Sequence, residues 1–236
     1  MPDGISPLAH ILGGLHAAPA RPGAVFGVAV HQMGSDIVER AVSAGADPLT
    51  FAAEYYLKPD SYFAHYVVGY DGEVVQVCDD TQKALHVGFQ PADRALFLDG
   101  GWVDKLPPEV VSAWRAHWPG LVSPAHAFPG PSPNAVYVGI ELIPIVDGCG
   151  AAPAHWLPAA KFTAEQHEAV VDLCVDIGRR HTLPTSWAMT ARLTTHEDLN
   201  PLQRTTRKPP AGWDPGWLRP EPWFDLGWVR LQLSGS

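Results

Sequence analysis

Two continuous apolar runs of strand length constrain the fold of this chain more than any other feature. The first, AVFGVAV over residues 24–30, ends at His31, and the second, AVYVGIELI over residues 135–143, is interrupted by Glu141. Runs without polar alternation are typical of strands that helices cover on both faces of a sheet. The chain is therefore predicted to be an α/β protein, a single domain with a central mixed β-sheet flanked by helices.

Each of these runs carries one polar residue that needs an explanation. A buried strand that ends in a histidine can place a ligand at the edge of a sheet, and the alternative for His31 is a structural histidine bonded to the backbone. Glu141 lies inside an otherwise apolar strand. A carboxylate in that position must be paired, bind a metal or serve in catalysis, because burying it alone is costly.

Local patterns predict the remaining elements. Residues 62–68 and 74–77 read as the two strands of a β-hairpin, joined at Asp71-Gly72, with His65 inside the first strand. Thr163 and Gln166 form a capping box at the start of the most regular helical pattern. Helices are expected over residues 35–46, 49–57, 107–118 and 163–181, with an apolar or amphipathic segment at 228–233.

Length and composition indicate one domain with an arm and an insertion. A chain of 236 residues that is 46% hydrophobic can bury a full core. Residues 1–23 are rich in Pro, Gly and Ala and are expected to form an N-terminal arm before a domain over 24–236. Residues 89–133 are rich in Pro and Trp and are interpreted as an insertion. Its role stays open between shaping specificity and binding a partner.

Charge and cysteine usage exclude several classes of function. The net charge is −9 with scattered Lys and Arg, which argues against nucleic acid and anionic membranes as partners. No apolar run reaches the roughly 18 residues of a membrane span. Three cysteines without a CxxC unit read as reduced thiols. No Lys or Arg precedes Arg21, so no secretory signal is recognised and synthesis in the cytoplasm is expected.

A proline-rich stretch over residues 194–216 offers two further potential ligands. His196 and Asp214 lie 18 positions apart, with Asp214 followed by Pro-Gly. Prolines reduce the conformational freedom of such a stretch, so it can hold two side chains at a set distance. Neutral imidazole and carboxylate are usual zinc ligands. The alternative is a surface loop that carries a His and an Asp by chance.

Six short motifs follow one another in a recognisable order. They are VAVH (28–31), AHYVVGYDGEVVQV (64–77), ALHVG (84–88), VGIEL (138–142), TTH (194–196) and WDPG (213–216). This order resembles the zinc-dependent N-acetylmuramoyl-L-alanine amidases of the type 2 family, which are related to phage lysozyme-like amidases and peptidoglycan recognition proteins. The resemblance spans residues 24 to about 217 and implies a peptidoglycan recognition protein-like amidase fold with an inserted segment.

The resemblance implies a zinc site and a catalytic carboxylate. His31, His196 and Asp214 would be the zinc ligands, which leaves a fourth position for water. Glu141 would act as general base and then as general acid. The bond cleaved would be the amide between N-acetylmuramic acid and the L-alanine of the stem peptide, in peptidoglycan or in small muropeptides, for lysis or remodelling of a cell wall.

The resemblance is less direct for the remaining site residues. Lys208 would stabilise the oxyanion, but it lies six positions before Asp214, whereas compact relatives have their lysine two positions before the ligand. Arg207 is the alternative. His65 and His86 match family positions near the groove and are assigned to substrate binding. The protein would act at a cell wall if delivered as a phage lysin or toxin, and in the cytoplasm if it recycles muropeptides.

Two other functions compete with the amidase. A non-catalytic peptidoglycan-binding module would have the same fold, but such members typically lose a zinc ligand, and here all three positions are filled. A cysteine hydrolase would use Cys78 with His65 or His86. The adjacent Asp79 and Asp80 disfavour it, because carboxylates raise the pKa of a nearby thiol. The last alternative is an α/β domain whose histidines are merely structural.

Overall fold

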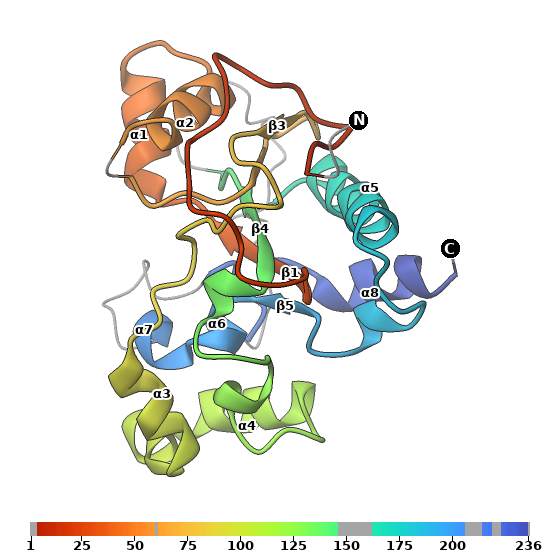
Figure 1. Cartoon of the computed structure of the whole chain (residues 1–236). Helices are drawn as coiled ribbons and strands as arrows, with labels where there is room; N and C mark the ends of the chain where they lie inside the picture. Colours follow the sequence, from red (N-terminus) through yellow and green to blue (C-terminus); the bar gives the residue numbers. More distant parts are fainter. Residues whose placement is uncertain (1–3, 60, 146–161, 206–213, 219–222, 236) are drawn as a thin grey trace.

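A five-stranded mixed sheet forms the centre of the protein in a computed structural model, which describes residues 4–59, 61–145, 162–205, 214–218 and 223–235 (Figure 1). The strand order is β3-β2-β4-β1-β5, and every neighbouring pair is parallel except β2 and β3. The predicted mixed sheet is confirmed. The strands are β1 (Gly27–Gln32), β2 (Tyr66–Val68), β3 (Val74–Gln76), β4 (Tyr137–Leu142) and β5 (Leu193–Thr195).

Strands β1 and β4 are the buried centre of the sheet, as their apolar runs predict. Their side chains alternate between two faces, and one face packs against the helices α5 (Ala164–Arg180) and α8 (Leu226–Ser234), which lie together on one side of the sheet in Figure 1. Each large apolar side chain buried in this layer contributes roughly 1.5–3 kcal/mol. Members of this core include Val28, Val30, Val138, Ile140, Val170 and Leu173.

Two helices cover the sheet at the β2–β3 end. They are α1 (Ser35–Ser43) and α2 (Pro48–Tyr56), which pack with Val67, Val75 and Ile143 in a second apolar cluster. Helix α2 begins where Asp47 accepts a hydrogen bond from the Thr50 amide at 2.7 Å. Both helices lie within about three residues of their predicted bounds.

The predicted hairpin is confirmed, with shorter strands than the sequence suggests. Its turn is closed by a hydrogen bond from the Gly69 amide to the Glu73 carbonyl at 2.9 Å. Gly72 has a φ of +82°, a conformation that favours glycine. A Cβ at this position would also lie 3.0 Å from the Glu165 carbonyl oxygen at the start of α5. Both the backbone conformation and the packing against α5 therefore favour glycine at position 72 of the Asp-Gly turn.

The segment over 89–133 forms a helical layer at the end of the molecule, beyond α6 (His196–Leu199) and α7 (Pro201–Thr205) (Figure 1). It contains α3 (Pro91–Leu98), η1 (Gly101–Lys105), α4 (Pro108–His117) and η2 (Pro124–His126), and η3 (Pro133–Ala135) begins at its last residue. The sequence predicts α4 but gives no prediction for α3. Three buried tryptophans of this layer pack against Leu202 of α7 and Leu218. They are Trp102, Trp114 and Trp118.

The described part of the N-terminal arm lies along the edge strand β3. The His10 amide donates to the Val74 carbonyl at 2.9 Å, and the Gln76 amide donates to the His10 carbonyl at 2.8 Å. The arm therefore occupies backbone groups that an edge strand would otherwise expose. No helix among the described residues is long and apolar enough to cross a membrane.

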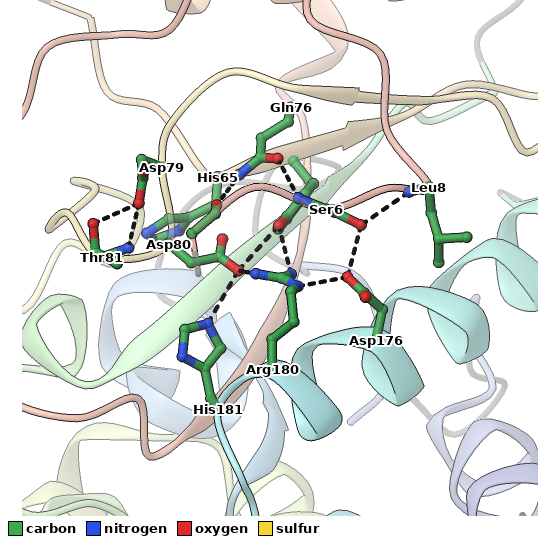
Figure 2. Close-up of polar contacts among 12 residues, drawn as sticks. Ser6, Leu8, His65, Gln76, Asp79, Asp80, Thr81, Asp176, Arg180 and His181 are labelled. Carbon is green, nitrogen blue, oxygen red and sulfur yellow. Dashed lines mark hydrogen bonds and ion pairs between the residues drawn. The ribbon is translucent and has the colours of Figure 1, made fainter. Parts of the chain in front are cut away.

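A buried polar network ties this arm to α5 (Figure 2). The Ser6 hydroxyl donates to Asp176 at 2.7 Å, and Arg180 contacts both Asp176 at 2.8 Å and Asp80 at 2.7 Å. Asp80 is fully buried and also accepts a hydrogen bond from the Tyr66 hydroxyl at 3.0 Å. The Arg180 charge balances a carboxylate that could not be buried alone.

Candidate metal centre

The carboxyl ends of two neighbouring parallel strands bring together two of the predicted ligands. Val30 of β1 and Thr195 of β5 are register partners, and the next residues along the chain are His31 and His196. His196 is the first residue of α6, whose start is fixed by a capping box between Thr195 and Asp198. Sheet pairing therefore sets the separation of these two imidazoles.

The three predicted ligands converge on one point. His31 Nδ1 lies 3.1 Å from His196 Nδ1, and His196 Nδ1 lies 3.0 Å from Asp214 Oδ2. The ligand atoms of all three residues lie within 4.8 Å of one another, and the side chains are only 1–3% exposed. Two imidazole nitrogens and a carboxylate oxygen at these separations fit one metal ion. The residues predicted as zinc ligands thus form a buried candidate metal centre.

In both imidazoles Nε2, the nitrogen that does not face the other ligands, lies within hydrogen-bonding distance of another side chain. His31 Nε2 lies 2.8 Å from His86 Nδ1, and His196 Nε2 lies 3.0 Å from the amide oxygen of Gln203 in α7. Gly88 makes room for this amide, because a Cβ there would lie 2.3 Å from Gln203 Nε2. Such outer partners orient ligating imidazoles and are a regular part of metal sites.

Asp214 is held from two directions. Its Oδ1 accepts a hydrogen bond from the Gln32 amide at the end of β1, and its backbone carbonyl accepts one from the Glu197 amide at 3.1 Å. The Glu197 carboxylate in turn accepts hydrogen bonds from the amides of Trp217 and Leu218. Glu197 thus joins the segment that carries Asp214 to the helix that carries His196.

Asp198 joins the same helix to the helical layer formed by residues 89–133. The indole N–H groups of Trp114 and Trp118 donate to its backbone carbonyl and its carboxylate, both at 2.9 Å. Its second carboxylate oxygen accepts a hydrogen bond at 2.9 Å from the hydroxyl of Thr195, the residue that caps α6. Two tryptophans of the 89–133 segment therefore hold the turn of helix that begins at His196.

The two carboxyl groups that follow His196 are both strongly affected by burial. Burial raises the pKa of Glu197 to about 8, the charge of Asp198 acts in the same direction, and the hydrogen bonds from Leu218 and Trp217 oppose it. Burial also raises the pKa of Asp198, against a lowering hydrogen bond from Trp118. A divalent cation bound nearby would favour the charged form of both groups.

Glu141 lies on the strand next to His31. The two residues are register partners on β4 and β1, so their side chains leave the same face of the sheet. Glu141 is 8% exposed. The Tyr56 hydroxyl lies within hydrogen-bonding reach of its carboxylate, and burial together with Glu141 and Asp214 raises the pKa of Tyr56 well above its usual range. Glu141, Tyr56 and the three ligands thus share one end of the sheet.

His65 and His86 are both buried and bonded inside the protein. His65 is fully buried, and its Nδ1 accepts a hydrogen bond from the Gly139 amide at 2.9 Å. His86 is 7% exposed, its Nε2 lies 3.2 Å from the Tyr137 carbonyl, and burial lowers its pKa to about 3. The assignment of both residues to substrate binding stays a prediction. Lys208 and Arg207, predicted for the oxyanion, lie outside the described residues.

Cys78 does not have the properties of a nucleophile. Its side chain is fully buried, and burial raises the pKa of the thiol to about 12, with the charges of Asp80 and Asp79 acting in the same direction. A catalytic thiol needs a lowered pKa and an exposed position. The cysteine-hydrolase alternative is therefore disfavoured by the structure.

Sequence reasoning missed four residues of the centre. Asp198 is indicated only in part, through the Thr195-x-x-Asp198 spacing of a capping box, and Glu197 has no such signal. Nothing in the sequence pattern singles out Gln203. Tyr56 is a core aromatic of α2, and nothing in the sequence pattern indicates that its hydroxyl lies beside Glu141.

Among three comparisons with known proteins, the match to a family model identifies the family. A search of curated protein sequences gives no match. A crystal structure of a selenomethionine AmpD derivative aligns over 98% of this chain and 97% of that one, with 18% sequence identity and a TM-score of 0.49. The family model described as N-acetylmuramoyl-L-alanine amidase, Amidase_2, matches residues 21–216. This match covers most of the chain and includes the three converging ligands, so the protein belongs to the N-acetylmuramoyl-L-alanine amidase family.

Proposed function

We propose that this protein is a zinc-dependent peptidoglycan hydrolase that cleaves the amide bond between N-acetylmuramic acid and the L-alanine of the stem peptide. The observation that carries the proposal is the convergence of His31, His196 and Asp214 beside Glu141. The choice of bond rests on membership of the family. Zinc and a carboxylate would serve equally well for another amide.

The donor set fits zinc in a hydrolytic site. Two imidazole nitrogens and one carboxylate oxygen are a usual ligand set of catalytic zinc, and three protein ligands leave a position open for water. A bound zinc ion supplies an acidified water molecule and polarises the carbonyl of the scissile amide. Burial of all three ligands keeps bulk water away from the donor atoms.

Glu141 performs the proton transfers in this proposal. Its carboxylate takes a proton from the water that attacks the amide carbon, and it returns that proton to the departing amine of L-alanine as the C–N bond breaks. The Tyr56 hydroxyl lies within hydrogen-bonding reach of this carboxylate and helps to hold it in place. Lys208 would stabilise the negative charge that develops on the carbonyl oxygen, as the resemblance implies.

The competing function is a peptidoglycan-binding module on the same fold. The complete ligand set with a carboxylate on the neighbouring strand favours an enzyme, because binding alone needs neither. His196→Ala separates the two functions when sacculi are incubated with each variant. The amidase account expects loss of stem-peptide release with little change in co-sedimentation. An exposed control, Glu39→Gln in α1, leaves both unchanged. Binding without turnover by the wild-type protein would favour the module.

A further inference from the structure

A chain of hydrogen bonds runs from the backbone of β4 to the candidate metal centre. It starts at the Tyr137 carbonyl oxygen, which lies 3.2 Å from His86 Nε2, and continues from His86 Nδ1 to His31 Nε2 at 2.8 Å. The far nitrogen of His31, Nδ1, faces His196 Nδ1 at 3.1 Å. The two rings of His31 and His86 stand edge to face, at 90° to each other.

The chemistry of the first member fixes the protons along this chain. A backbone carbonyl only accepts hydrogen bonds, so His86 carries its proton on Nε2. In the neutral ring, Nδ1 is then an acceptor, and the proton of the bond between the two rings must come from His31 Nε2. Consequently His31 is the Nε2–H tautomer, and its lone pair is on Nδ1, the atom that faces the other two ligands.

Two further features hold the His86 ring in place. Gly139 leaves a slot on the face of β4, because a Cβ at this position would lie 2.7 Å from His86 Cγ and 2.8 Å from His86 Nδ1. Asn134 holds the backbone of His86 and of the next residue, Val87. Its Oδ1 accepts from the amides of His86 and Val87 at 3.2 and 2.7 Å, and its Nδ2 donates to the Val87 carbonyl at 2.9 Å.

We propose that His86 is a positioning residue of the metal centre: it selects the Nε2–H tautomer of His31 and thereby makes Nδ1 the ligand atom, with Gly139 as the slot that admits its ring. This role rests on the metal site of the proposed function and requires no contact between His86 and substrate. It differs from the substrate-binding assignment that the sequence suggests for His86.

Zinc affinity tests this role without reference to turnover. His86→Leu removes the acceptor and should weaken zinc binding by about 10- to 100-fold, the usual effect of losing an outer partner of a ligating histidine. His86→Asn restores an acceptor at the position of Nδ1 and should recover much of the affinity. His126→Leu, an exposed histidine of η2, should bind zinc as the wild type does. Affinity is measured by competition with a chromophoric chelator.

The outcomes separate this proposal from the proposed function. If His86→Leu binds zinc as tightly as the wild type and loses only activity, His86 is a substrate residue and the proposal is overturned. If the wild type binds no zinc, the metal site itself fails, and the proposal fails with it.

A second measurement uses the wild type alone, so that a variant that fails to fold does not decide the matter. Long-range ¹H–¹⁵N correlation spectra of the zinc-loaded protein report which nitrogen of His31 carries the proton. A proton on Nε2 supports the proposal, and a proton on Nδ1 contradicts it.

Discussion

His31 and Glu141 are register partners on two central parallel strands, so backbone pairing fixes a metal-ligand candidate and a carboxylate side by side. Neighbouring strands lie about 4.8 Å apart. His31 is the last buried residue of β1, and Glu141 lies at the matching level of β4, at the carboxyl end of the sheet. The separation of the two groups therefore needs no loop to maintain it. It is set by the backbone pairing of two buried strands.

Replacing Glu141 with Gln should abolish most turnover without removing the metal. The amide keeps the size of the side chain but cannot accept a proton from water, so kcat should fall by about 10²- to 10⁴-fold. Zinc affinity should stay close to that of the wild type, because Glu141 is not among the converging ligands. Steady-state kinetics on a soluble muropeptide and chelator competition check the two parts. Retention of full kcat would exclude Glu141 as the proton carrier.

The helical layer formed by residues 89–133 should stabilise the helix that begins at His196. Trp118→Phe keeps most of the buried area but removes the N–H donor to Asp198. Leaving a buried carboxylate without this donor should cost about 1–3 kcal/mol in the free energy of unfolding, and zinc affinity should also fall.

Trp102→Phe is the matched control for this prediction, because Trp102 packs in the same cluster with its ring against Trp114. It should lower stability through lost packing and leave zinc affinity unchanged. Urea denaturation and chelator competition measure the two quantities. Equal effects of both variants on zinc affinity would show that the Asp198 contact does not support the site.

Removing Arg180, the positively charged member of the polar network in Figure 2, should cause a large loss of stability. Arg180→Met leaves Asp80, which is fully buried, without the partner that lies 2.7 Å away. Breaking a buried pair from one side typically destabilises by about 3–5 kcal/mol. Arg179→Met, one position away and exposed, should change the free energy of unfolding by less than about 0.5 kcal/mol. A small effect of Arg180→Met in urea denaturation would mean that the pair is replaceable.

His65 should make the protein less stable in acid. Burial lowers its pKa well below the usual range, and the nearby Arg21 charge adds to the shift. The folded ring stays neutral, whereas the unfolded chain takes up a proton below about pH 6.5. Because the unfolded state then binds one proton more, the free energy of unfolding falls with decreasing pH, by up to about 1.4 kcal/mol per pH unit.

The variant His65→Asn isolates this contribution, since asparagine does not titrate and can still accept the Gly139 hydrogen bond. Between pH 7 and 5 its free energy of unfolding should fall less steeply than that of the wild type. Parallel curves for the two proteins would show that His65 does not contribute to the acid sensitivity.

The sequence predicts those parts of the fold that have a local cause. The apolar runs of β1 and β4, the Asp-Gly turn and the capping box of α5 act within a few residues, and each is found where expected. Strand β5 was missed because its three residues, Leu193–Thr195, contain no apolar run. Helix α3 was missed because its short pattern, with one buried residue at Phe97, is not distinct from a loop.

The candidate site was predictable as a set of residues but not as a geometry. The motif order points to His31, His196 and Asp214, whereas their convergence depends on strand order and register, which no local pattern encodes. The outer partners depend on tertiary contacts, because His86 lies 55 positions from His31 and Gln203 meets His196 only through the packing of two short helices. Gln203 and His86 reach the ligands from a short helix and a loop, and their residue types alone do not identify such a role.

The measurement that tests the central claim most directly is mass spectrometry of purified peptidoglycan after incubation with the protein, with and without a chelator. The account predicts free stem peptides that begin with L-alanine, together with peptide-free glycan. These products should be lost on chelation and restored by zinc. Cleavage within the stem peptide or the glycan, or the same products in the presence of the chelator, would contradict it.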